Sequence, residues 1–192
     1  MKICLYGASS NNIDKIYIEA TEKLGEELAR RGHTLVFGGG AAGLMGAAAR
    51  GCTKENGKII GISPKFFDVD GVLYDKCTEF IYTETMRERK QLLEDMSDGF
   101  IVMPGGPGTF DELFETLALR QLGQHNKPIA IFNINGYYNP LGEMLKVAYT
   151  GGFMTKEVLD LAPLFSDETQ LLRYLEDNRE GTGDFSVLKT IG

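Results

Sequence analysis

GFIVMPGGPGTFDELF, residues 99–114, contains an apolar run, a glycine-rich loop and the start of an amphipathic helix. We predict a buried strand over Gly99–Met103, a sharp loop over Pro104–Gly108 and a helix over Thr109–Gly123. A strand, a glycine loop and a helix in this order direct several backbone N–H groups at one spot, where the helix dipole adds positive potential. The segment therefore predicts an anion site, although it is not a Walker A loop because the Lys-Ser/Thr ending is absent.

The rest of the chain repeats this alternation of short β-rich runs and helix-length amphipathic segments. Further strands are predicted at Lys2–Tyr6, Thr34–Phe37, Lys58–Ile62, Glu79–Tyr82 and Ile129–Phe132. Further helices are predicted at Asp14–Arg31, Gly43–Glu55, Thr85–Met96, Pro140–Gly151 and Thr169–Asn178. The pattern is typical of βαβ units and predicts an α/β, Rossmann-like three-layer αβα fold with a mostly parallel central sheet. We expect one nucleotide-binding domain over residues 1–178 and a short, loosely ordered tail over 179–192.

Composition narrows the function classes. The chain has 192 residues, 43% of them hydrophobic and 24% charged, which is ordinary for a globular domain. No apolar run approaches the roughly 18 residues that span a bilayer, and the first residues do not resemble a signal peptide, so a cytoplasmic location is predicted. A net charge of −7 argues against a nucleic-acid surface. Three scattered cysteines and two histidines predict reduced thiols and no metal site.

A second glycine loop, Gly38-Gly39-Gly40-Ala41-Ala42-Gly43-Leu44-Met45-Gly46, joins a predicted strand to a helix. Its glycine spacing is not that of a dinucleotide fingerprint, and Gly61–Pro64 lacks the acidic residue that would bind a ribose, so a redox enzyme using NAD is a weak alternative. The glycines could serve only positive φ angles and close helix–sheet packing. Exposed amides at Gly39 and Gly40 would also suit a phosphate or ribose.

Thr109 and Glu112 admit two interpretations. Their spacing is that of a capping box, with Thr109 as N-cap and Glu112 at the third helical position. Alternatively, Thr109 binds the anion and Glu112 is a functional carboxylate about a ribose's length away. The surplus glycines before Thr109 are not needed for a cap.

The predicted helix Thr85–Met96 carries an arginine on its apolar stripe. Met86, Arg89 and Leu93 share one face at helical spacing. An inward-facing guanidinium needs an anionic partner, because an unpaired buried charge is very costly. A solvated face with Glu–Lys pairs is the ordinary alternative, and it suits Arg87 and Glu88.

Three motifs together resemble the LONELY GUY family. Pro104–Glu112 matches the family motif PGGxGTxxE, Met86–Lys90 matches MxxRK, and Gly38–Gly46 is similar to GGGxxGLMG. Pro107 occupies the variable position of the first motif, and the resemblance runs over about residues 1–178. It implies a phosphoribohydrolase that splits adenosine 5′-monophosphate (AMP) or N6-substituted AMP into free base and ribose 5-phosphate, without a cofactor or metal. It also implies a homodimer.

The resemblance implies roles for residues of these motifs. Arg89 and Glu112 would be catalytic, with Glu112 stabilising a cationic ribosyl group and activating water. The substrate and its phosphate would be bound by Gly105, Gly106, Gly108, Thr109, Met86, Lys90, Gly39, Gly40 and Glu84. A non-catalytic nucleotide carrier or sensor of the same superfamily is the alternative function. Similar chains are labelled lysine decarboxylase, but no lysine here has a context that identifies a pyridoxal phosphate Schiff base.

Overall fold

A seven-stranded parallel sheet forms the centre of the molecule in the computed structural model, which describes residues 1–181. Its strands are β1 (Lys2–Tyr6), β2 (Thr34–Phe37), β3 (Lys58–Pro64), β4 (Glu79–Thr83), β5 (Gly99–Val102), β6 (Ile129–Phe132) and β7 (Leu164–Phe165). Their order across the sheet is β4-β3-β2-β1-β5-β6-β7, and each neighbouring pair is parallel. The predicted fold class is confirmed.

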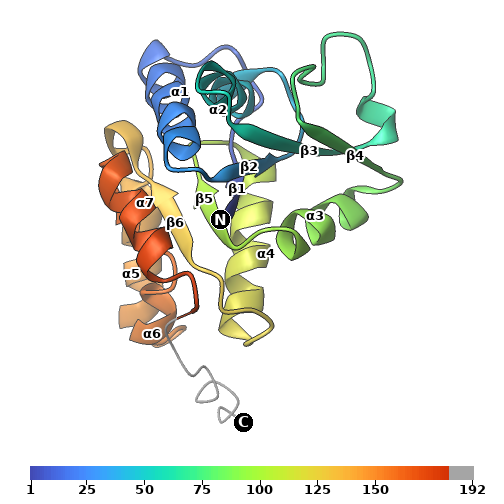
Figure 1. Cartoon of the computed structure of the whole chain (residues 1–192). Coiled ribbons are helices and arrows are strands. Elements are labelled where there is room, and N and C mark those ends of the chain that lie inside the picture. The colour runs from blue at the N-terminus through green and yellow to red at the C-terminus, as the bar shows by residue number, and fades with distance from the viewer. Residues whose placement is uncertain (182–192) are drawn as a thin grey trace.

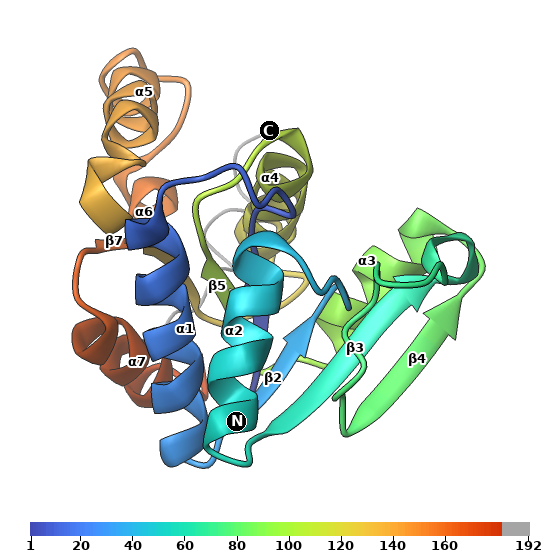
Figure 2. The ribbon, with the colours of Figure 1, turned by 90° about the horizontal axis from the view of Figure 1, so that it is seen from above.

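Helices cover both faces of this sheet (Figures 1 and 2). They are α1 (Lys15–Arg30), α2 (Gly43–Lys54), α3 (Met86–Asp95), α4 (Pro107–Gln121), α5 (Asn139–Thr150), α6 (Lys156–Leu159) and α7 (Glu168–Asp177). Two 3₁₀ turns, η1 (Lys65–Phe67) and η2 (Ile134–Gly136), follow β3 and β6. Gly32, just beyond α1, has a positive φ of 72°, a conformation that glycine adopts readily where a helix ends.

Alternating side chains of the strands form two cores, one on each face. Ile3 and Leu5 pack with residues of α1, α2 and α7. Cys4 and Tyr6 point to the opposite face, where they pack with residues of α3 and α4 such as Leu93. Because successive strand side chains alternate between faces, strands with apolar residues at every position are buried on both sides.

Helix α2 packs closely on two sides. Where it begins, a Cβ on Gly43 would lie 2.3 Å from the Ala8 carbonyl oxygen, just after β1. Along its length it also lies beside α1 (Figure 2). A Cβ on Gly25 would lie 2.2 Å from the Ala48 carbonyl oxygen, and one on Gly51 would lie 1.9 Å from that of Glu22. Each helix therefore needs glycine where the other backbone passes.

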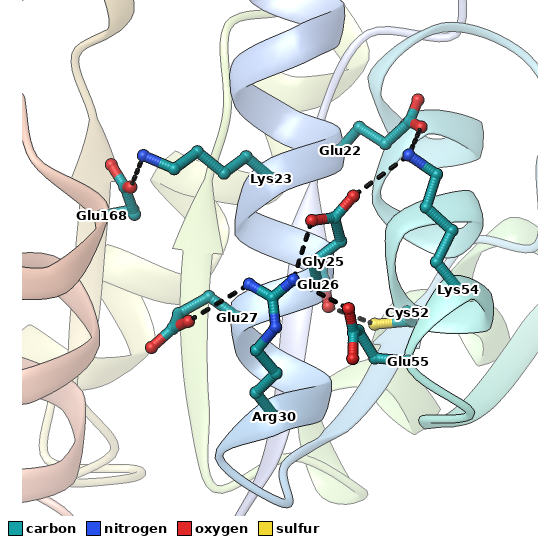
Figure 3. A network of polar contacts seen from close by, with 10 residues as sticks. All are labelled: Glu22, Lys23, Gly25, Glu26, Glu27, Arg30, Cys52, Lys54, Glu55 and Glu168. Atoms are coloured by element: carbon teal, nitrogen blue, oxygen red, sulfur yellow. Dashed lines mark hydrogen bonds and ion pairs between the residues drawn. The ribbon is translucent and has the colours of Figure 1, made fainter.

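Ion pairs cover the seam between these two helices (Figure 3). Lys54 pairs with Glu22 and Glu26, while Arg30 pairs with Glu26 and Glu55. These pairs are largely solvated, so each contributes little to stability, on the order of 0–1 kcal/mol. The packed glycine surfaces, not the charges, determine how α1 and α2 fit together.

Elements too short for a periodic pattern escaped prediction. These are η1, η2, the four-residue helix α6 and the two-residue strand β7. One domain over residues 1–178 stays a prediction, which a continuous sheet running from β4 to β7 supports. Of the predicted tail, residues 182–192 lie outside the described residues.

Candidate active site

A cavity of about 630 Å³ lies beyond the carboxyl ends of the central strands. The sheet order reverses between β1 and β5, and parallel α/β sheets bind ligands at such a switch point. The loops after β1, β2, β3 and β5 all contribute to the lining, together with the first turns of α3 and α4. Residues from five segments line it, among them Ser9, Gly38, Gly40, Met45, Phe67, Val72, Met86, Arg89, Gly106, Thr109 and Glu112.

Arg89 and Glu112 form an ion pair in this cavity. Arg89 Nη1 donates to Glu112 Oε1 at 3.0 Å, and the two side chains are only 10% and 11% exposed. Arg89 Nε also donates to the Ile62 carbonyl at 3.3 Å. The anionic partner that the sequence required for an inward-facing Arg89 is therefore Glu112, which comes from the neighbouring helix α4.

Burial raises the pKa of the Glu112 carboxyl above its ordinary value of 4.5. The charge and hydrogen bond of Arg89 oppose this rise, because a positive neighbour favours the ionised carboxylate. A carboxylate with a raised pKa is a better proton acceptor than one in water. Glu112 is thus suited to take a proton within the cavity.

The capping-box interpretation of Thr109 and Glu112 is wrong. Helix α4 begins at Pro107 with Gly106 as its N-cap, so Thr109 is the third residue of the helix. Neither residue caps α4, because no side chain bonds to its first amides at the N-cap. The first-turn amides of Gly108 and Thr109 lack intrahelical partners and remain available to a ligand.

The structure places most of the other predicted binding residues around the cavity. Gly40, Gly106, Gly108, Met86 and Lys90 line it. Lys90 also pairs with Asp111 at 2.9 Å and with Glu115.

Three predicted binding residues are not brought to the lining. Among the described residues that line the cavity, Gly39, Gly105 and Glu84 are absent. Gly39 and Gly105 each adjoin a lining residue, whereas Glu84 is exposed and pairs with Lys65. The geometry does not favour a contact between Glu84 and the ribose.

Gly38 is a residue that sequence reasoning missed. A Cβ at position 38 would lie 2.0 Å from Arg89 Nη2, which is far inside van der Waals contact. Any larger residue here would displace the guanidinium, which passes directly over the backbone of the β2 loop. The triple glycine was a visible signal, but which of its members faces a side chain depends on how α3 packs on β3.

Two further lining segments were also missed. Gly7, Ala8 and Ser9 follow β1, and their position at a switch point could have indicated them. Phe67 and Val72 belong to an irregular segment between β3 and β4 that has no periodic signal. The Ala41 amide donates to the Val72 carbonyl at 2.9 Å and holds this segment beside the second glycine loop.

Comparisons with known proteins agree with this architecture. The family model described as "Possible lysine decarboxylase" matches residues 45–175. A probable cytokinin riboside 5′-monophosphate phosphoribohydrolase of Oryza sativa subsp. japonica is 35% identical over 92% of this chain and 72% of its own length. A cytokinin riboside 5′-monophosphate phosphoribohydrolase of Arabidopsis thaliana is 33% identical over 96% of this chain and 86% of its own.

Solved structures share the fold at lower identity. The molybdenum cofactor binding protein of Rippkaea orientalis superposes with a TM-score of 0.69 at 22% identity, covering 92% of this chain and 96% of that one. This likeness concerns the fold alone. The family match and the identity to the plant proteins over most of both chains go further, and they show that the chain belongs to the LONELY GUY family.

Proposed function

We infer that this chain hydrolyses the N-glycosidic bond of adenosine 5′-monophosphates, plain or N6-modified, to free base and ribose 5-phosphate. The plant relatives are named phosphoribohydrolases of cytokinin riboside 5′-monophosphates. One observation carries the inference to this chain: the buried pair of Arg89 and Glu112 lies in the same cavity as the free amides at the start of α4. A phosphate site and a carboxylate about one helical turn apart match the two ends of a ribose 5-phosphate.

The reaction requires a water oxygen to bond to C1′ as the bond from C1′ to the base breaks. Positive charge develops on the ribosyl group in the transition state, as in other glycoside hydrolyses. Glu112 stabilises this charge and orients or deprotonates the attacking water. Arg89 keeps Glu112 ionised and in position.

Binding energy from the two ends of the substrate positions the bond that breaks. The amides of Gly106, Gly108 and Thr109 bind the 5′-phosphate, and that remote contact orients the ribose. Met86 and Phe67 supply apolar surface for the base. An apolar lining of this kind accepts an N6 substituent as well as plain adenine.

The family description as a possible lysine decarboxylase does not fit the lysine in this cavity. A lysine that forms a Schiff base with pyridoxal phosphate needs an ammonium that readily loses its proton. The hydrogen bonds that the Lys90 ammonium donates to Glu115 and Asp111 raise the pKa of Lys90 instead. The lining lysine is therefore held in its charged form, which suits neutralising a phosphate.

Activity should be lost in acid at a pH higher than the ordinary pKa of a glutamate, 4.5. Catalysis needs ionised Glu112, and burial raises its pKa above 4.5, so kcat/KM falls as the pH drops through this raised value. The pH profile of kcat/KM measures the acid limb, with circular dichroism as a check that the protein stays folded. An acid limb at or below 4.5 would show that Glu112 is not the titrating group.

Substituting Gly38 by alanine should impair catalysis more than folding. The new Cβ meets Arg89 Nη2 at 2.0 Å and displaces the guanidinium from Glu112. We expect turnover to fall by about 10²-fold, the effect of losing one electrostatic catalytic group. Gly142→Ala is the matched control, because a Cβ there makes only an ordinary 3.8 Å contact with Leu164. Equal turnover in the two variants would contradict the need for glycine at position 38.

The function itself is tested by incubating the protein with AMP and with N6-isopentenyl-AMP. Chromatography should detect free base and ribose 5-phosphate in equal amounts, and the two rates rank the substrates. Tight, stoichiometric nucleotide binding without released base would instead identify a nucleotide carrier.

We also propose that the chain forms a homodimer through the outer face of α4. Phe114 and Leu122 on and just beyond this helix are 39% and 62% exposed, and a groove lined by Phe110 and Phe114 lies between α3 and α4. Light scattering would give the oligomeric state.

No helix in the described part of the chain is long and apolar enough to cross a membrane. A cytoplasmic location and the lack of nucleic-acid binding stay predictions from the sequence.

A further inference from the structure

The four backbone carbonyls of residues 103–106, in the loop before α4, all accept hydrogen bonds within the protein. The Pro104 carbonyl accepts from the Ala8 amide at 3.1 Å, and the Gly106 carbonyl accepts from the Phe110 amide at 3.0 Å. The other two carbonyls, of Met103 and Gly105, accept from two consecutive tyrosines. The loop is thus fixed through its acceptors, whereas the amides of Gly105 and Gly106 donate to no acceptor among the described residues.

Tyr137 and Tyr138 are these two tyrosines. The Tyr138 hydroxyl donates to the Met103 carbonyl at 2.7 Å, and the Tyr137 hydroxyl donates to the Gly105 carbonyl at the same distance. Tyr138 is buried, whereas Tyr137 is 39% exposed and packs edge-on against Tyr138 and Tyr17. Neither tyrosine lines the cavity. They therefore contact the loop without themselves lining the cavity.

The bond from Tyr137 determines where one particular amide points. A peptide group is planar and trans, so the C=O of Gly105 and the N–H of Gly106 point in opposite directions. Since Tyr137 holds the carbonyl, the Gly106 N–H points away from Tyr137. Gly106 lines the cavity, while Gly105 does not. Within the described residues, the Gly106 amide donates to no acceptor, which leaves it free for an anion.

Without the bond from Tyr137, the Gly105–Gly106 peptide plane would flip easily. It joins two glycines, which restrict rotation of the backbone less than any other residue. A flipped peptide would present the Gly105 carbonyl oxygen to the cavity, where it would repel a phosphate. The bond from Tyr137 opposes that flip.

The turn that carries both tyrosines is itself constrained. Asn135 and Gly136 both have positive φ angles, 50° and 71°, which bring the chain round after β6. Asn133 Oδ1 accepts from the Tyr138 amide at 2.7 Å, and its Nδ2 donates to Asn139 Oδ1 at 2.8 Å. This arrangement lets two adjacent side chains reach the same loop.

We propose that Tyr137 is a positioning residue, which holds the Gly105–Gly106 peptide so that the Gly106 N–H faces the substrate's 5′-phosphate. The proposal rests on the proposed function, because it takes a nucleoside monophosphate as the ligand. It assigns a role in phosphate binding to a residue that contacts neither substrate nor reacting atoms.

The test compares Tyr137→Phe with wild type by calorimetry, using AMP, ribose 5-phosphate and free adenine as probes. Removing one hydrogen bond should lower the affinity for AMP and for ribose 5-phosphate by about 2- to 12-fold and leave the affinity for adenine unchanged. Tyr149→Phe is the matched control, because Tyr149 is equally exposed at 39% but lies on α5, away from the loop. Its affinities should all equal those of wild type.

Each other outcome has a definite meaning. Equal AMP and ribose 5-phosphate affinities in Tyr137→Phe and wild type would overturn the positioning role while leaving the proposed function intact. A parallel loss of adenine affinity would mean a general disturbance of the cavity and would overturn it too. A wild-type protein that binds AMP but releases no base would overturn the hydrolase and leave the positioning role standing. Wild-type protein that binds none of the probes would overturn both.

Discussion

Glu112→Gln should reduce the release of base from AMP by about 10²- to 10⁴-fold, the contribution typical of a general base. The amide is nearly the same size and still accepts a hydrogen bond from Arg89, so the cavity keeps its shape. It cannot take a proton or carry the negative charge that stabilises a cationic ribosyl group. Calorimetry should therefore give an AMP affinity close to that of wild type while chromatography detects little base.

Glu143→Gln makes the same chemical change on α5, where the side chain is exposed, and it should leave turnover unchanged. An active Glu112→Gln protein would remove the carboxylate from the mechanism. A variant that lost AMP binding and thermal stability together would point to a structural role for Glu112.

Arg89→Ala should lower turnover at least about 10²-fold and should also destabilise the protein. The substitution leaves a carboxylate that is only 11% exposed without its cation. Breaking a buried pair typically costs about 3–5 kcal/mol, and uptake of a proton by Glu112 will relieve part of this cost at low pH. Because Arg89 lowers the pKa of Glu112, its loss raises that pKa further and moves the acid limb of the residual activity to higher pH.

Arg87→Ala is the control for this experiment, since Arg87 lies on the exposed side of the same helix. Thermal melts and rates measured on both variants separate catalysis from stability. A rate for Arg89→Ala equal to that of Arg87→Ala would exclude Arg89 from the mechanism.

The fold could be predicted from the sequence because its long elements carry strong local signals. The buried strands β1 and β6 read as short apolar runs bounded by polar or turn residues, and their predicted limits are those observed. Strand β7 has only two residues, and α6 has four, so neither contains a full period of any pattern. Their conformation depends on contacts with β6 and α5 rather than on their own residues.

The candidate site was only partly predictable, for a related reason. Arg89 stood out because a charge on an apolar stripe is a local anomaly. Gly38 and Tyr137 act on residues about 50 and 32 positions away, Arg89 and Gly105, and no local pattern reports such a contact. Their roles appear only when the elements are packed together.

The mistaken cap at Thr109 shows how a motif can mislead. The pattern Thr-x-x-Glu fixes a spacing but not where the helix starts. Pro107 was the better signal, because proline is favoured at the first helical position, where its missing N–H costs nothing. Moving the N-cap by three residues, from Thr109 to Gly106, changes Thr109 from a cap into a candidate phosphate ligand.

The strand order has a consequence for synthesis on the ribosome. Strands β1 to β4 lie next to one another in the order in which they are translated, so this half of the sheet can pair as it emerges. The other edge of β1 must wait for β5, since Ile3 pairs with Gly99, and until then it is an open edge prone to wrong partners. In the sequence, Arg89 comes before β5 and Glu112 comes after it. A nascent chain therefore acquires its ion pair only once β5 and the first turns of α4 have been made, before β6 and β7 are translated.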